Sequence, residues 1–404
     1  MSDVTDHLLF AQDSTEQWRA RVEKELKGKS YEDHLIWKSA EGFTIESWQN
    51  SLPTPLAQLT NLEEPWKIVE PIYEKDAQKA NEEALAALNQ GAEAIWFFKG
   101  FLGAAAEVAL RGIDTGIAPA FVQGGNCIDP YRELLRVKGD TDFSEAGNLL
   151  LNGKRLRNRG AGLIDEVAFL LAQGLETGKT NGFDAPILFH TGVGNAFLSE
   201  IAKVRALRWL WTSILRKEGK EPRNPMILAS NLTITNAKND EHSNILRATS
   251  SAMSAVLGGA QFVMVEPWDL PWKESNNFRK RISRNIQNLL KEEGRLDKNL
   301  NQADGAYLIE HLTTTIAEKA WERVQEIEAA GGFTAYAKSG ELRRNLETSG
   351  KALVEAYENG ERNLLGVNKY PPSTVVPETP RRSTEYALLP AVIDLPLHLQ
   401  SVNA

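Results

Sequence analysis

Short apolar runs alternate with amphipathic segments along most of the chain. Apolar runs typical of strands occur at 95–98, 117–122, 187–189, 226–229 and 262–265. Apolar residues at helical spacing predict helices over 77–89, 197–215, 282–290 and 312–327. Because strands that alternate with helices favour a parallel sheet, the pattern predicts an α/β fold.

The stretch 241–269 is the most specific part of this pattern. A predicted helix ends at Gly258 and Gly259, since glycine permits the left-handed turn that stops a helix. The run 262–265 that follows reads as a strand buried on both faces, and Glu266 and Asp269 come directly after it. In a barrel of alternating strands and helices, ligands bind at this end of the strands.

Three parts are expected along the chain. Residues 1–65 read as an N-terminal arm that carries a short helix and the aromatic residues Trp37, Phe43 and Trp48. Aromatic side chains in an arm need cover, which the barrel or a second subunit must supply. Residues 66–370 hold the strand–helix alternation, and the proline-bearing residues 371–404 are expected to form an extended or helical wrap.

Composition sets the outer limits. The chain has 404 residues, a net charge of −8 and no basic block, which argues against a nucleic-acid partner. A single cysteine, Cys127, excludes internal disulfides and thiolate metal clusters, and no histidine spacing suits a metal. The N-terminus lacks an export segment, and no apolar run approaches the ~20 residues of a membrane span. We therefore expect a soluble cytoplasmic protein.

Several segments carry a family pattern in a fixed order. Within 240–269 the spacing D-x-x-x-N-x-L-R-x-T, then L-G-G-A, then P-x-D is present, and further matching segments lie at 35–43, 197–211, 281–294, 307–332 and 364–371. By these segments nearly the whole chain resembles the substrate barrel of adenosylcobalamin-dependent methylmalonyl-CoA mutases. The residues of the central match are Asp240, Asn244, Leu246, Arg247, Thr249, Gly258, Gly259, Pro267 and Asp269.

The resemblance implies a fold and an activity. The fold would be a (β/α)8 TIM barrel, and the reaction would be the radical interconversion of succinyl-CoA and (R)-methylmalonyl-CoA. Cobalamin domains of this family carry a histidine in a D-x-H-x-x-G motif, and none of the six histidines here has that context. We therefore expect no cobalamin-binding domain in this chain. Adenosylcobalamin would be held by a partner, either a large catalytic subunit or a separate cobalamin-binding protein.

The barrel departs from the pattern of catalytic members. Where those resemble Q-T-S-G, this chain has Ser230, Asn231, Leu232 and Thr233, and in the next strand a histidine and an asparagine are replaced by Met264 and Glu266. An acyl-CoA channel needs small lining residues, and phenylalanine, methionine and tryptophan would fill it. The resemblance is therefore to the smaller, non-catalytic subunit of heterodimeric mutases.

His190 is the candidate catalytic residue. It follows the apolar run 187–189, at the strand end where barrel chemistry takes place, and it matches a histidine that donates a hydrogen bond to the acyl group in catalytic members. The alternative is a histidine that hydrogen-bonds a neighbouring loop.

Six further residues are candidates for substrate binding. Arg247 is either an anion clamp or half of an ion pair with Asp240 or Asp269. A basic face of one helix either contacts a CoA phosphate or is solvated. The turn at 192–195 permits an anion at a helix N-terminus, but a turn of this kind is more often a tight βα connection. The full candidate set is Asn231, Arg247, Gln261, Arg281, Arg284 and Asn285.

Two other functions stay open. The chain is either the acyl-CoA-binding catalytic barrel of a split mutase, or a repurposed barrel that binds another acyl or carboxylate ligand without radical chemistry. A homodimer of the isolated chain is also possible, and the sequence does not decide which acyl-CoA is involved.

Overall fold

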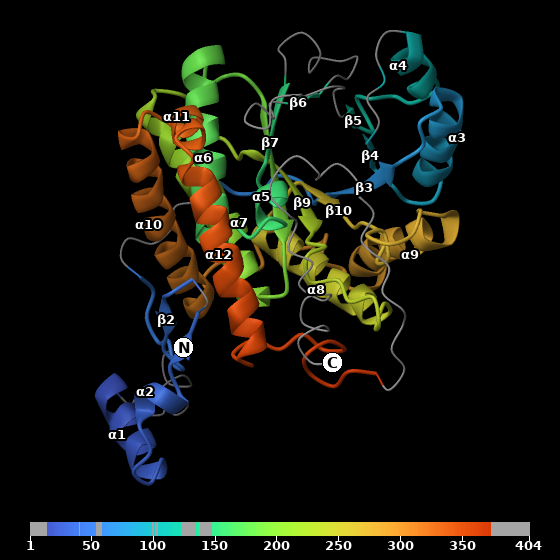
Figure 1. The fold of residues 1–404 in the computed structure, drawn as a ribbon. Helices are drawn as coiled ribbons and strands as arrows, with labels where there is room; N and C mark the ends of the chain where they lie inside the picture. The colour runs from blue at the N-terminus through green and yellow to red at the C-terminus, as the bar shows by residue number, and fades with distance from the viewer. Residues whose placement is uncertain are drawn as a thin grey trace, which may run out of the picture.

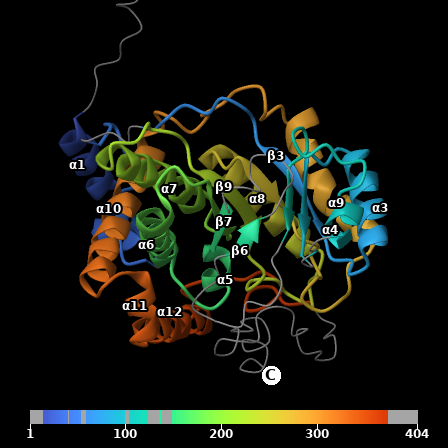
Figure 2. The ribbon, with the colours of Figure 1, turned by 90° about the horizontal axis from the view of Figure 1, so that it is seen from above.

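A single curled sheet forms the centre of the molecule, with helices packed around its outside (Figures 1 and 2). The computed structural model describes residues 14–39, 41–53, 59–98, 101, 104–122, 135–137 and 148–372. Within these ranges, no helix is long and apolar enough to cross a bilayer. Cys127 and most of the expected C-terminal wrap lie outside the described residues, so the wrap and the domain boundaries stay predictions.

The sheet has eight strands in the order β5-β4-β3-β10-β9-β8-β7-β6. Its end strands β5 and β6 are not hydrogen-bonded to each other, yet some of their Cα atoms come within 8 Å, so the sheet curls into a barrel-like shape. The strands are β3 (Lys67–Ile72), β4 (Ala94–Phe97), β5 (Ala120–Val122), β6 (Leu135–Val137), β7 (Asn148–Asn152), β8 (Ile187–Val193), β9 (Met226–Asn231) and β10 (Phe262–Met264).

Seven of these strands are parallel, which confirms the predicted α/β class. The eighth, β6, runs antiparallel to β7, so the TIM-like barrel that the prediction named has seven parallel strands in the described residues. A parallel pair needs a crossover of about a dozen residues or more. The connection between β6 and β7 is shorter than that, whereas an antiparallel pair tolerates a short connection.

Helices cover the outside of the sheet (Figure 2). Four of them confirm the predicted helical segments, namely α3, α7, α9 and α10, and the observed bounds differ from the prediction by a few residues. The helices around and beyond the sheet are α3 (Ala77–Leu88), α4 (Ala104–Ala109), α5 (Gly153–Arg157), α6 (Leu163–Asn181), α7 (Phe197–Lys217), α8 (Ser243–Gly258), α9 (Asn277–Asn288), the π-helical turn η2 (Leu289–Glu293), α10 (Tyr307–Ala329), α11 (Phe333–Lys338) and α12 (Glu341–Glu358).

The predicted end of α8 is confirmed. Gly259 adopts a left-handed conformation with φ of 88°, and its amide donates a hydrogen bond to the carbonyl of Val256. Strand β10 begins three residues later and pairs on both sides with parallel neighbours. The glycine pair therefore fixes the start of β10. Glu266 and Asp269 follow the other end of this strand.

The N-terminal arm consists of α1 (Thr15–Glu25), α2 (Tyr31–His34) and a hairpin of β1 (Trp37–Lys38) and β2 (Thr44–Ile45). Trp18 lies 4.8 Å from Trp48 and 6.2 Å from Tyr31, measured between ring centroids. Phe43 is buried in the main core, whereas Trp37 remains 50% exposed. The barrel therefore covers only part of the aromatic arm, which lies beside α10 (Figures 1 and 2).

Helix α12 and the turn after it cover the carboxyl end of β9. Tyr357, Leu364 and Val367 pack with Leu232 and Ile234 in one buried cluster. These apolar contacts hold the C-terminal part of the described chain against the strand end where barrel proteins usually place ligands.

A close backbone approach fixes α12 on the barrel. Gly160 has φ of 104°, and a Cβ at this position would lie 2.7 Å from the Cα of Gly350 in α12. Gly160 therefore needs to be glycine, both for its conformation and for space.

We predict that Gly160→Ala destabilises the protein more than Gly182→Ala. Both glycines have a positive φ, but a Cβ added at Gly182 would have no atom within 4 Å. The clash at Gly160 should add about 1–3 kcal/mol to the loss of unfolding free energy. Chemical denaturation of both variants measures the difference, and equal losses would contradict a tight contact with α12.

Candidate functional site

The inside of the sheet is filled by apolar side chains. Trp96 and Phe121 lie 5.7 Å apart between ring centroids, and Phe121 and Phe262 lie 5.1 Å apart. Because alternate residues of each strand face inward, every parallel strand contributes to this cluster. The apolar layer consists of Val69, Ala94, Trp96, Phe121, Leu150, Leu188, Leu228, Phe262 and Met264.

Polar side chains lie at the carboxyl end of this layer. Lys154, from the start of α5, forms a buried ion pair and hydrogen bond with Glu266, which follows β10. Since β8 and β9 lie between β7 and β10 in the sheet, this pair reaches across the inside of the barrel. With His190 of β8 and Ser230 of β9 it forms a group that we call the polar cap.

His190 is the centre of the polar cap. Its side chain is 4% exposed, and its Nε2 lies 2.7 Å from the Ser230 hydroxyl oxygen. Burial, together with the positive charge of Lys154, holds the pKa of His190 well below its usual value. Its Nδ1 atom and the indole nitrogen of Trp96, whose ring centroid lies 5.7 Å away, have no hydrogen-bond partner among the described residues. The predicted bond to a loop is therefore replaced by a bond to the next strand.

The chemistry open to this arrangement is limited by its burial. A neutral histidine beside a serine is a pair that can transfer a proton, but such a pair needs a substrate within hydrogen-bond reach. Ser230 is 2% exposed and His190 4%. Behind them, the space between β9, β10 and α8 leaves no room for a water molecule. The polar cap is therefore enclosed by its own chain.

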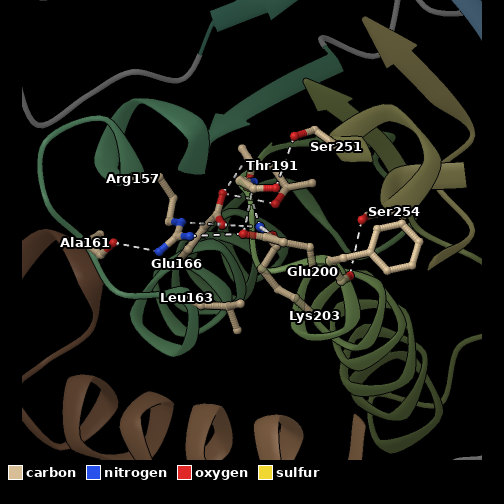
Figure 3. A network of polar contacts seen from close by, with 12 residues as sticks. Arg157, Ala161, Leu163, Glu166, Thr191, Glu200, Lys203, Ser251 and Ser254 are labelled. Atoms are coloured by element: carbon tan, nitrogen blue, oxygen red, sulfur yellow. Dashed lines mark hydrogen bonds and ion pairs between the residues drawn. The ribbon is translucent and has the colours of Figure 1, made fainter. Parts of the chain in front are cut away.

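A second set of buried charges lies outside the sheet, between β8 and helices α5, α6 and α7 (Figure 3). The Lys203 ammonium lies 2.7 Å from Glu166 and 2.6 Å from Glu200, and all three side chains are at most 1% exposed. Arg157 lies 3.1 Å from Glu200 and 3.6 Å from Glu166. Although burial works to raise it, Lys203 and Arg157 hold the pKa of Glu200 below its usual value.

This four-residue network binds the turn after β8. Glu166 accepts hydrogen bonds from the amide of Gly192 at 2.7 Å and from the hydroxyl of Thr191 at 3.0 Å. Glu200 accepts from the amide of Gly194 at 3.0 Å. Internal carboxylates thus bind the amide of Gly192 near the end of β8 and the amide of Gly194 in the turn before α7. An anion at the N-terminus of α7 and its alternative, a tight βα turn, both stay predictions.

Two of the predicted substrate residues lie at the ends of strands, because Asn231 is the last residue of β9 and Gln261 directly precedes β10. The Asn231 side-chain oxygen accepts a hydrogen bond from the amide of Glu266 at 2.8 Å. Gln261 directly precedes Phe262, which faces inward, so Gln261 faces outward. Its side chain accepts a hydrogen bond from the amide of Ile227 at 2.9 Å. Both side chains therefore link neighbouring strands.

Arg247 lies on α8 and holds the C-terminal turn. Its guanidinium donates hydrogen bonds to the Asn244 side chain at 2.7 Å and to the carbonyl of Leu365 at 2.5 Å. Burial lowers its pKa, and Asp240 acts in the opposite direction. Asp269 pairs with Arg279 at 2.7 Å. Arg247 thus interacts electrostatically with Asp240, while a different arginine satisfies Asp269.

The three predicted residues of α9 do not lie together. Arg284 is buried and pairs with Glu70 of β3 at 2.9 Å, on the outside of the sheet, and it donates to Gln90 at 2.6 Å. Arg281 is exposed. Asn285 is half-buried, and its side-chain oxygen accepts a hydrogen bond from the side-chain amide of Asn288 at 3.4 Å. The structure brings His190 and Asn231 to the strand ends, whereas Arg247, Gln261 and the α9 residues lie outside the barrel. Substrate binding by these residues stays a prediction.

The sequence reasoning missed Lys154, Trp96 and the network around Lys203. A signal was present in α7, where Glu200 and Lys203 interrupt an apolar segment at a spacing that places them on one helix face. Among residues 14–372, outside the undescribed gaps, no group of three histidine, cysteine or acidic side chains is arranged to hold a metal ion.

We predict that Lys203→Met strongly destabilises the protein. Removing the ammonium leaves Glu166 and Glu200 buried with only Arg157 between them, and breaking a buried pair costs about 3–5 kcal/mol. The matched control is Lys179→Met, which removes a 57% exposed partner of Glu328 and should cost less than about 1 kcal/mol. Urea unfolding measures both variants, and similar losses would show that the network is dispensable.

We also predict a pH-dependent contribution from Glu70. Burial raises its pKa to about 7 despite the neighbouring Arg284, whereas an unfolded glutamate titrates near about 4.3. Because the folded state binds the proton more tightly, the contribution of Glu70 to stability is full below the unfolded pKa. It is then lost as the pH rises through about 7.

The measurement compares wild type with Glu70→Gln by denaturant unfolding across this pH range. As the pH rises, the unfolding free energy of wild type should fall relative to that of Glu70→Gln. A difference that is constant with pH would contradict a raised pKa.

Comparisons with known proteins place the chain in a family. The family model described as "Methylmalonyl-CoA mutase" matches residues 141–387. The methylmalonyl-CoA mutase small subunit of Porphyromonas gingivalis is 28% identical over 90% of this chain and 70% of its own length.

Two other relatives match less of the chain. The methylmalonyl-CoA mutase of Rhizobium meliloti is 30% identical over 64% of this chain, and the large subunit of the Propionibacterium freudenreichii subsp. shermanii enzyme is 29% identical over 55%. This chain spans only 39% and 32% of those two proteins. The region that the family model matches contains β7 to β10, the polar cap and the network around Lys203. By this match the chain belongs to the methylmalonyl-CoA mutase family.

Proposed function

We propose that this chain is a mutase subunit of the small type, which supports a larger catalytic partner. The partner would bind adenosylcobalamin and carry out the interconversion of succinyl-CoA and (R)-methylmalonyl-CoA. The observation that supports this proposal is the filled barrel, in which Trp96, Phe121 and Met264 occupy the space that a threaded acyl-CoA would need. The similarity to a small subunit agrees with it.

Adenosylcobalamin supplies the radical in this type of reaction, and we assign it to the partner chain. His190 is the histidine inside the barrel at the strand ends, but it is buried and bonded to Ser230. It therefore does not fit as a ligand for a cofactor that approaches from outside. The arm is the part of this chain that we expect to contact the partner, because Trp37 is half exposed on it. A cytoplasmic location is part of the same proposal.

One observation favours the split-mutase alternative. The Nδ1 atom of His190 and the indole nitrogen of Trp96 are both buried and have no partner in the described part of the chain, and an acyl group that entered the barrel would meet them. This alternative requires the apolar layer to open, so direct binding of acyl-CoA distinguishes it from the support function.

We predict no binding of acyl-CoA by the isolated chain. Calorimetric titration with succinyl-CoA and methylmalonyl-CoA, with desulpho-CoA as the control, should give no heat beyond dilution, because the interior is filled. Micromolar binding that is lost in His190→Ala would contradict the support function and favour a split enzyme. If Arg247→Ala then still binds acyl-CoA, the ligand lies in the barrel interior and not at α8.

The same preparation tests the partner. A purified large, cobalamin-bearing mutase subunit should co-elute with the wild-type chain in gel filtration. Trp37→Ala should weaken the complex by more than it destabilises the chain, since half of this side chain is exposed and the rest packs near Phe43. A large subunit that elutes separately and is fully active alone would overturn the proposed support.

A further inference from the structure

The N-terminal arm reaches the barrel at the start of α6. The hairpin of β1 and β2 has its turn at Glu41 and Gly42, and the Ser39 hydroxyl accepts a hydrogen bond from the Glu41 amide at 3.1 Å. The Glu41 carboxylate accepts a hydrogen bond from the amide of Leu163, the first residue of α6, at 2.8 Å. Gly162, which precedes this helix, has no side chain that could bond the free amides of the first turn. The arm therefore supplies a cap that Gly162 cannot.

Gly162 leaves the space that this carboxylate occupies. A Cβ at Gly162 would lie 2.5 Å from a carboxylate oxygen of Glu41. The backbone of Gly162 has φ of −64°, a conformation that other residues adopt, so space and not conformation favours glycine at this position. A methyl group here would push the Glu41 carboxylate away from the end of α6.

The first turn of α6 also holds the end of β8. Glu166 lies in this turn and accepts hydrogen bonds from the hydroxyl of Thr191 and the amide of Gly192, both in β8. Arg157 binds the same helix end, because its guanidinium donates to the carbonyl of Ala161 at 3.0 Å and lies 3.6 Å from Glu166 (Figure 3). A contiguous chain of contacts thus runs from the hairpin through α6 to the strand end.

Glu41 also acts on the charges of this network. Although burial works to lower it, neighbouring carboxylates that include Glu41 raise the pKa of Arg157. The hairpin is therefore held to α6 by a hydrogen bond and by attraction to a buried guanidinium.

The hairpin and the root of the arm are held by separate contacts. Phe43 of the hairpin packs in the main core. At the root, Arg208 of α7 donates a hydrogen bond to the carbonyl of Thr60 at 2.7 Å. Contacts at the hairpin can therefore break while the root of the arm stays bound.

We propose that Glu41 is a positioning residue that couples the arm to the strand end at His190. With the hairpin docked, Glu41 holds the first turn of α6, and Glu166 in that turn holds β8. When the hairpin is pulled away, both should loosen together, so a molecule that binds the arm alters the strand end without touching it. The proposal concerns contacts within one chain and does not rest on the proposed mutase function.

The test is hydrogen exchange of the purified full chain, followed by mass spectrometry. Glu41→Ala should raise the exchange rate of the Leu163 amide about tenfold, because loss of the cap frees the first turn of α6. The decisive readout lies farther away, at the amide of Gly192, which should exchange about threefold faster or more while the amides of β9 keep their rates. Glu41→Gln should have a smaller effect, since its side-chain oxygen can still accept from Leu163.

Two further variants separate this route from a general loosening of the arm. Glu46→Ala removes an arm carboxylate that accepts a hydrogen bond from the Tyr31 hydroxyl at 2.9 Å, and it should leave the exchange of Gly192 unchanged. Gly162→Ala should accelerate Gly192 as Glu41→Ala does, because the added methyl displaces the carboxylate from the barrel side. The two changes combined should add nothing to either one alone.

An unchanged Gly192 amide in Glu41→Ala, with faster exchange confined to Leu163, would reduce the contact to a local helix cap and overturn the proposal. Equal acceleration by Glu46→Ala would overturn it too, as would acceleration that spreads uniformly into β9.

Discussion

The filling of the barrel is the constraint on which the rest of the structure depends. A curled parallel sheet encloses a space that either side chains or a ligand must occupy, because an empty apolar interior loses its packing contacts. Here Trp96, Phe121 and Phe262 occupy it with tilted and edge-to-face rings. Once these large side chains are in place, they fill the layer below the described strand ends. The polar groups there bond to one another.

The two buried charge clusters act on different parts of the same strand ends. Lys154 and Glu266 join the segments after β7 and β10 across the inside, while Lys203 holds Glu166 and Glu200 behind the turn after β8. Each charge has a partner, as burial demands. Together they fix the backbone around His190 from within and from outside the sheet, so the position of the histidine does not depend on a bound substrate. A buried ion pair adds little net stability compared with apolar packing, since desolvation offsets most of its attraction, and its contribution here is geometry.

The sequence predicted the elements whose signal is local. β8, β9, α7 and α10 were found because their apolar residues follow one period. β3 was missed because Glu70 and Pro71 interrupt its apolar run, and their place is explained only by the pairing of Glu70 with α9. The antiparallel β6 was missed because strand direction depends on the length of a connection and not on the residues of the strand.

The candidate site was harder to predict than the fold. His190 and Asn231 lie at the strand ends as expected, since the end of an apolar run marks the end of a strand. Gln261 does not face the barrel interior, because side chains alternate along a strand and its neighbour Phe262 faces inward. Arg284 looked like a free cation because its partner, Glu70, is more than two hundred residues away in the sequence. Contacts of this kind follow from topology, which local patterns do not contain. They also hold the strand ends in one conformation, and a rigid surface loses little conformational entropy on association, as the proposed support of a second subunit requires.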